Sequence, residues 1–186
     1  MRKVQREQIM DLATYDRSRD EIRPRILEAK RKRRVHVGGV LTFLFENAST
    51  IRYQVQEMLR AERIQDDAAI RHELDTYNEL LGDRGELGVS LLIEIADPAE
   101  RDRKLREWLA LPGHLYAKLE SGEKVRPRFD PRQVGTDRLS SVQYLKLDVK
   151  GAVPVAIGCD LPGLEVETAL GEEQRAALRE DLASDS

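Results

Sequence analysis

The polar side chains best suited to chemistry lie near the middle of the chain, where residues 51–64 have the periodicity of a helix. Four of them fall on one helical ridge: Arg52, Gln56, Arg60 and Arg63. Because side chains on one ridge point the same way, we expect their guanidinium groups to converge on a carboxylate or a phosphate. The alternative is a solvated face on which Arg and Glu pair at helical neighbour spacing, which is common and only weakly stabilising.

A second predicted helix carries a histidine among carboxylates. Four residues share one side of it: His72, Asp75, Thr76 and Glu79. Glu57 or Glu62 of the preceding antiparallel helix is expected to approach them. Imidazole and carboxylate groups together suit a divalent metal or general acid–base catalysis. The spacing matches neither His-Glu-x-x-His nor the Glu-x-x-His pair of di-iron bundles, so a surface or capping histidine is the alternative.

These two helices define a candidate ligand or partner site. It consists of Arg52, Tyr53, Glu57, Arg60, Glu62, Arg63, His72, Glu73 and Tyr77. The weaker metal candidates are His36, His72 and Glu79. On a predicted strand, His36 points away from the face of Val35 and Val37, so it joins His72 only if that side is packed; a solvent-facing histidine is the alternative.

Other chemistries have less support. The sequence lacks a P-loop, a dinucleotide-binding glycine fingerprint and a Gly-x-Ser-x-Gly elbow. The single cysteine, Cys159, precedes Asp160, which raises a thiol pKa, so we expect a structural cysteine. One cysteine cannot hold an iron–sulfur cluster, and the sequence requires no cofactor. The basic run at residues 30–34 is expected to be a solvated helix end, which disfavours nucleic acid as a partner.

The elements that position these residues follow from periodicity and caps. Asn47, Ser49 or Thr50 is predicted to cap the first helix, and a second helix spans residues 66–81, so that the two form a hairpin. Three further helices are predicted at 16–32, 98–111 and 172–182. Strands are predicted at 34–37, 41–46, 86–95, 114–119, 142–149 and 153–157. This order lacks regular βαβ spacing, so we predict an α+β fold: an antiparallel or mixed sheet with a helical hairpin and flanking helices.

Composition bounds the organisation of the chain. Its 186 residues, 40% hydrophobic and 35% charged, predict a single domain over residues 1–186, with a possible N-terminal arm at 1–15 and an acidic C-terminal appendage at 160–186. Residues 1–34 carry a net charge of +6 and residues 160–186 a net charge of −6, so the two ends could attract each other or different partners. The charged start and the lone cysteine predict a cytoplasmic protein, and the apolar runs are too short for a membrane span.

Two blocks of the sequence resemble a known family. Residues 33–63, with their Leu-Thr-Phe-Leu-Phe-Glu-Asn segment, and residues 72–95 are similar to an uncharacterised family of bacterial proteins classed as a domain of unknown function. Proteins of that family are encoded beside rubrerythrin-like proteins and iron–sulfur proteins related to heterodisulfide reductase. The resemblance therefore implies a shared redox or oxidative-stress process, and it brings no agreed catalytic residues.

Two functional hypotheses follow. The first is a non-enzymatic accessory or interaction protein of an iron-linked redox system, which acts through the helical hairpin and the adjoining strand pair and binds a rubrerythrin-like or iron–sulfur protein. The second is a small-molecule enzyme or an anion- or metal-binding protein, in which Arg52, Arg60 and Arg63 hold an anion while His72, Glu57 and Tyr77 act in acid–base or metal chemistry. Homo-oligomerisation is left open.

Overall fold

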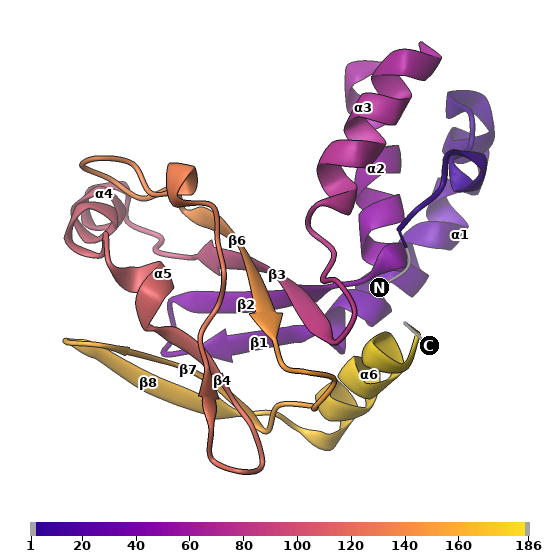
Figure 1. The fold of residues 1–186 in the computed structure, drawn as a ribbon. Coiled ribbons are helices and arrows are strands. Elements are labelled where there is room, and N and C mark those ends of the chain that lie inside the picture. Colours follow the sequence, from indigo (N-terminus) through magenta and orange to yellow (C-terminus); the bar gives the residue numbers. More distant parts are fainter. Residues whose placement is uncertain (1–2, 185–186) are drawn as a thin grey trace.

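Two antiparallel sheets and an arm of helices make up the structure, a computed structural model that describes residues 3–184 (Figure 1). The helices are α1 (Leu12–Arg31), α2 (Ala48–Glu62), α3 (Asp67–Asn78), α4 (Pro98–Glu107), α5 (Leu111–His114) and α6 (Glu172–Ala183), with 3-10 turns η1 (Arg6–Gln8) and η2 (Pro131–Gln133). The strands are β1 (Arg34–Val37), β2 (Leu41–Glu46), β3 (Glu86–Ile93), β4 (Leu115–Lys118), β5 (Lys124–Val125), β6 (Val142–Asp148), β7 (Ala156–Leu161) and β8 (Leu164–Ala169). The predicted α+β class is confirmed.

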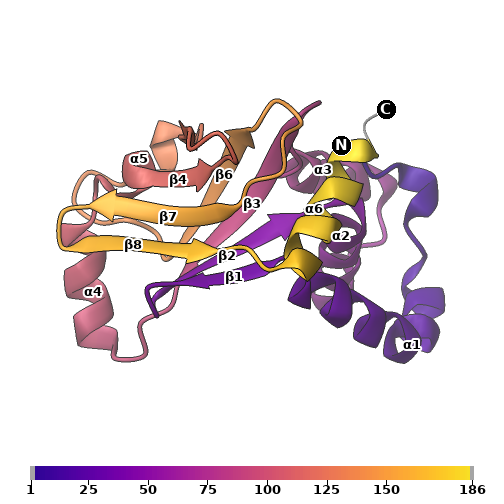
Figure 2. The same cartoon turned by 90° about the horizontal axis from the view of Figure 1, so that it is seen from below.

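The two sheets stack face to face and enclose the main core (Figures 1 and 2). The first sheet has the strand order β1-β2-β3-β6 and the second has the order β5-β4-β7-β8. Strand residues alternate between the two faces of a sheet. Accordingly Phe43, Phe45 and Leu91 are buried between the sheets, whereas Thr42 and Ser90 lie on the outer face of the first sheet.

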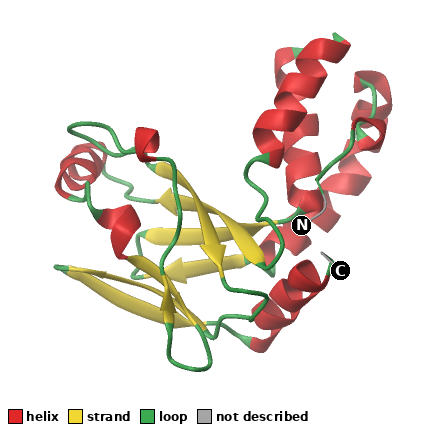
Figure 3. Cartoon of the chain, viewed as in Figure 1, coloured by secondary structure: helices red, strands yellow, loops and turns green. Residues whose placement is uncertain are grey.

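Helices α1, α2 and α3 form an arm that projects from one end of the first sheet (Figures 1 and 3). Asn47, one of the three predicted caps, begins α2, and Asp66 caps α3. Apolar residues at helical spacing pack the arm around a second core, which includes Ile51, Val55 and Leu74. The arm therefore carries its own hydrophobic core, separate from the one between the sheets.

Two glycines make the joint between the arm and the sheet. A Cβ atom added to Gly88 would lie 2.0 Å from the carbonyl oxygen of Leu80. A Cβ atom added to Gly82 would lie 2.5 Å from the carbonyl oxygen of Glu86. The absence of side chains thus lets the end of α3 rest directly on β3. This contact places α3 beside the outer face of β6.

Side chains complete the hydrogen bonding at both edges of the first sheet. At β6, the Gln133 amide accepts from the backbone N–H of Tyr144 (2.6 Å) and donates to its carbonyl (3.0 Å). At β1, Gln174 donates to the Arg34 carbonyl (2.7 Å) and Thr168 donates to the His36 carbonyl (3.1 Å). Backbone groups at both edges are thus paired with side chains from outside the sheet.

Several predicted boundaries were wrong. Helix α1 begins at Leu12 and not at the predicted residue 16, because Asp11 caps it. Pro24 lies inside the helix on its exposed side, where water can hydrate the unmatched carbonyl. The predicted helix at 98–111 ends at Glu107, and Pro112 belongs to the short α5 instead of stopping α4. The strand predicted at 153–157 spans 156–161, and the sequence analysis missed β8.

The two ends of the chain pack into the fold. Of the expected arm at 1–15, residues 1 and 2 lie outside the described residues, whereas Val4 and Ile9 are buried against the helical arm. The expected acidic appendage at 160–186 instead supplies the end of β7, all of β8 and α6 through residue 184; residues 185 and 186 lie outside the described part. The buried Asp181 of α6 forms a two-point ion pair with Arg33 (2.7 and 2.9 Å). Attraction between the oppositely charged ends is thus realised within the fold.

Candidate functional site

Glu57, at the centre of the predicted site, is engaged by α1. Arg19 donates two hydrogen bonds to its carboxylate (2.7 and 2.8 Å), and the Tyr15 hydroxyl donates a third (2.6 Å). The bonds from Arg19, more than that from Tyr15, lower the pKa of Glu57 to about 2, and burial raises the pKa of Tyr15. This carboxylate is therefore an anchor between helices and a poor proton acceptor near neutral pH.

The residues of the predicted arginine ridge of α2 do not share one site. Gln56 is buried and binds the backbone of Met10, and Arg60 donates to Asp16 (2.7 Å). Arg63 adopts a left-handed conformation at the C-terminal cap of α2. Arg60 and Arg63 line a cleft of about 410 Å³ together with Asp16, whereas Arg52 lines a different, smaller cavity. Convergence of the guanidinium groups is thus limited to Arg60 and Arg63.

The remaining predicted site residues lie apart from one another. Tyr53 lines the smaller cavity, and the Lys30 ammonium lies 5.5 Å from its ring centre. Glu62 and His72 are exposed, Glu73 is half-buried, and burial raises the pKa of the half-buried Tyr77. The structure does not gather these side chains into one enclosed site.

The metal candidates also lie apart. His36 is exposed and its Nδ1 is 2.8 Å from the Thr42 hydroxyl, which donates to Glu94. Since the single hydroxyl proton of Thr42 is directed to Glu94, His36 Nδ1 is the donor, which leaves its Nε2 facing outward. Within residues 3–184, no three His, Cys, Asp or Glu side chains are grouped as ligands for a metal ion.

The basic run at 30–34 and the cysteine are parts of the packed structure. The expectation of a wholly solvated helix end was wrong at Arg33, which is buried against Asp181, while Arg31 pairs with Glu28 and Glu173. Cys159 is buried, and burial raises the pKa of its thiol, as expected of a structural cysteine. No helix in the described chain has the length and apolar character needed to span a bilayer.

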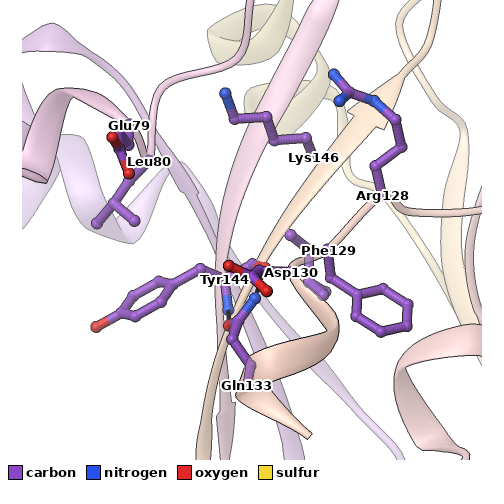
Figure 4. A pocket seen from close by; sticks show the side chains of 9 residues that line it. Glu79, Leu80, Arg128, Phe129, Asp130, Gln133, Tyr144 and Lys146 are labelled. Atoms are coloured by element: carbon purple, nitrogen blue, oxygen red, sulfur yellow. Dashed lines mark hydrogen bonds between the residues drawn. The ribbon is translucent and has the colours of Figure 1, made fainter.

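An open groove of about 470 Å³ lies between the end of α3 and the outer face of β6 (Figure 4). Three separate segments line it: Glu79 and Leu80 after α3, Arg128, Phe129, Asp130 and Gln133 before β6, and Tyr144, Leu145 and Lys146 within β6. Tyr144 is one of the few large hydrophobic residues exposed on the described surface, with 42% of it accessible. Of these residues, the sequence analysis had named only Glu79 among its candidates.

The charges of the groove are only partly compensated. Arg128 forms an ion pair with the buried Glu86, and Asp130 forms one with Arg132. Lys146 and Glu79 have no ion pair among residues 3–184. In contrast to Glu57, Lys146 is free to bind a group from another molecule, while Glu79 acts electrostatically on Arg132 without forming an ion pair.

Comparison with known proteins places the chain in a family. Residues 3–182 match the model of a family described as "Protein of unknown function (DUF3501)". The chain belongs to the DUF3501 family. No curated protein matches this DUF3501 chain significantly.

A solved structure shares the fold. This DUF3501 chain is similar to a protein of unknown function from Burkholderia pseudomallei K96243, whose crystal structure was determined at 1.90 Å resolution. The two chains are 27% identical, the match covers 97% of this chain and 100% of that chain, and the TM-score is 0.88. The solved structure supports the α+β architecture, and neither comparison brings an activity with it.

Proposed function

We propose that this DUF3501 protein is a non-enzymatic accessory or interaction protein, and that it docks a partner protein at the junction between the helical arm and the first sheet. The observation that carries the proposal is the groove itself, where exposed Tyr144 lies beside Lys146, a cation without an ion pair in the described chain. Exposed aromatic residues flanked by charged groups are typical of interfaces. By contrast, the chain's own arginine neutralises Glu57, the carboxylate best placed for acid–base chemistry on the helices.

The partner proposed is a component of an iron-linked redox or oxidative-stress system. This part rests on the resemblance of residues 33–63 and 72–95 to proteins encoded beside rubrerythrin-like and heterodisulfide-reductase-related iron–sulfur proteins. Any iron centre of such a system would belong to the partner, because the single cysteine of this chain cannot hold a cluster.

A binding experiment tests the proposal. Purified protein is titrated with a purified rubrerythrin-like protein and, separately, with a heterodisulfide-reductase-related iron–sulfur protein from the same organism, and heat of binding is measured. We expect a Kd of about 10 μM or lower for one of them, which corresponds to roughly 7 kcal/mol. Absence of binding to both at micromolar concentration would remove the proposal.

Two variants localise the interface. Tyr144→Ala and Lys146→Glu are expected to weaken binding by about tenfold or more, because both side chains line the groove. The matched controls are Leu27→Ala, an exposed apolar residue of α1, and Arg23→Glu, an exposed cation of the same helix. Equal losses in the α1 variants would contradict docking at the groove.

One observation favours a second function, anion binding on the helical arm. Arg60 and Arg63 line the same cleft, with Asp16 as the counter-charge of Arg60. Inorganic phosphate at millimolar concentration should then raise the melting temperature of the protein but not that of Arg60→Ala. An equal rise in both proteins would exclude this cleft as the phosphate site.

A further inference from the structure

We propose that the groove receives an extended segment of the partner protein, and that an acidic side chain of this segment binds between Arg128 and Lys146. The inference rests on the proposed docking function and specifies its chemistry. For a segment that runs antiparallel to β6, it predicts a recognition motif in which an acidic residue is followed, two positions along, by a large apolar residue.

The cationic end of the groove arises from strand pairing. The backbone N–H of Arg128 donates to the carbonyl of Lys146 (2.7 Å), and the N–H of Lys146 donates to the carbonyl of Arg128 (2.8 Å). Residues that exchange both hydrogen bonds stand directly opposite each other, with their side chains on one face. Figure 4 shows both cationic side chains at the same rim of the groove. Like charges in such a pair are destabilising, so an added carboxylate between them is favourable.

Of these two cations, only Arg128 forms an ion pair within the described chain. Glu86 binds one terminal nitrogen of the Arg128 guanidinium and also accepts from the backbone of Asp83. This anchor leaves the other guanidinium nitrogens of Arg128 directed outward, and 63% of its side chain is exposed. Asp83 and Asp148 also act electrostatically on Arg128. Lys146 has no ion pair of its own in the described chain, so it is the unpaired cation of the two.

An apolar contact lies at a fixed distance from the cationic pair. Tyr144 precedes Lys146 by two positions on β6, so both side chains lie on the same face about 7 Å apart. Leu80 lines the α3 wall of the same groove, whereas the Phe129 ring points away from Tyr144 and packs against the core between the sheets (Figure 4). An extended partner segment has the same two-residue period, so its acidic and apolar side chains would meet Lys146 and Tyr144 in register.

The openness of the groove favours a polypeptide over a small organic acid. Small-molecule sites bury about 70–90% of their ligand, whereas here 63% of the Arg128 side chain and 42% of Tyr144 are accessible. The partner segment would lie on the face of the sheet, because Gln133 already occupies the edge of β6 beside Tyr144. Glu79 on the α3 wall disfavours a second acidic side chain at that end, which favours a single acid in the motif.

Fluorescence anisotropy with three labelled peptides tests the inference. The probe is fluorescein-Ser-Glu-Ser-Phe-Ser-Gly, and the comparison peptides carry Gln or Lys in place of Glu. We expect the Glu peptide to bind with a Kd below about 1 mM and at least about tenfold more tightly than the Gln peptide. Its binding should weaken as salt is added, since the contact is an exposed ion pair. No binding of the Glu peptide, or equal binding of the Gln peptide, would overturn the inference.

Variants and a competitor complete the test. Lys146→Ala should reduce the preference for Glu over Gln to about threefold or less, while the exposed α1 control Arg23→Ala should retain it. Melting temperatures of both variants show whether they fold as the wild type does. Competition by free glutarate with the same affinity as the peptide would assign the site to small acids and overturn the polypeptide assignment.

The test of the acidic segment and the test of the proposed function can fail independently of each other. If an iron-linked partner binds but Lys146→Ala binds it equally well, the acidic-segment inference fails and docking by another surface stands. If the partners do not bind but the Glu peptide does, the redox assignment fails and the chemistry of the groove stands.

Discussion

The helical arm and the groove beside it both contain many charged residues, but the central charged groups of the two regions differ in how they are paired. On the arm, Glu57 is held by Arg19 and Tyr15, and beneath it Arg33 is held by Asp181. In the groove, Lys146 and Glu79 have no ion pair in the described chain. The comparison teaches that the density of charged residues in a sequence does not mark the site, because intramolecular pairing decides which groups remain available.

The most buried ion pair should give the largest effect on stability. Asp181→Ala leaves the Arg33 guanidinium buried without its carboxylate and also removes the acceptor of the Asn47 amide. We expect the free energy of unfolding to fall by about 3–5 kcal/mol, measured by urea denaturation. Asp137→Ala, which removes an exposed ion pair with Arg106, is the control and should change it by less than about 1 kcal/mol. Similar small losses in both would show that buried pairing does not distinguish the two regions.

The next largest effect on stability is expected at Gly88, in the joint between the helical arm and the first sheet. Gly88→Ala drives a methyl group into the Leu80 carbonyl, which must move with the end of α3. A loss of about 2–3 kcal/mol is expected, together with weaker partner binding because the groove wall shifts. Gly113→Ala is the matched control, since nothing lies within 4 Å of its added Cβ atom. Wild-type stability in Gly88→Ala would show that the joint is not tightly packed.

The pH dependence of stability should distinguish the paired Glu57 of the helical arm from the unpaired charges of the groove. Glu57→Gln is expected to lose about 1–2 kcal/mol near neutral pH because charged hydrogen bonds to Arg19 and Tyr15 are replaced by weaker ones. The pKa of Glu57 in the folded protein, about 2, lies below its ordinary value of 4.5. Its contribution is therefore fully present above about pH 4.5 and is lost as the pH falls toward about 2. The unfolding curves of wild type and variant should converge over that range; a constant difference would show that Glu57 does not titrate as described.

The smallest effects on stability are expected in the groove. Tyr144→Ala and Lys146→Ala should each change the free energy of unfolding by less than about 0.5 kcal/mol, because neither is buried in a network. Losses above about 2 kcal/mol would mean that these residues are structural, and the comparison between the two regions would fail.

Local signals in the sequence were enough for most of the elements. The Gly38-Gly39 turn joins β1 and β2 with Arg34 opposite Leu44, as a hairpin requires, and the caps at Asn47 and Asp66 place α2 and α3. Strand β8 was missed although Leu164 and Val166 alternate with Glu165 and Glu167, a pattern typical of a half-exposed strand. The Pro162-Gly163 turn, which joins β7 and β8 into a hairpin, was a second local signal.

The groove could not be predicted because its walls come from three distant segments. The one local signal was the irregular alternation in β6, where Tyr144 occupies an outward position that a polar residue would usually fill. The opposite error arose on α2, where regular spacing predicted that arginines converge. Arg60 instead pairs with Asp16 of α1, which lies 44 residues away in sequence.

The amide of Gln133 has a consequence for solubility. A strand edge with unpaired backbone groups can recruit strands from other molecules and start aggregation. Here a single side chain, from a segment without strand structure, occupies the backbone groups of Tyr144 on that edge. Losing this amide would expose the backbone groups of Tyr144 to neighbouring copies without disturbing the core, while the bridge between Arg128 and Lys146 would still cover the next position on the same edge.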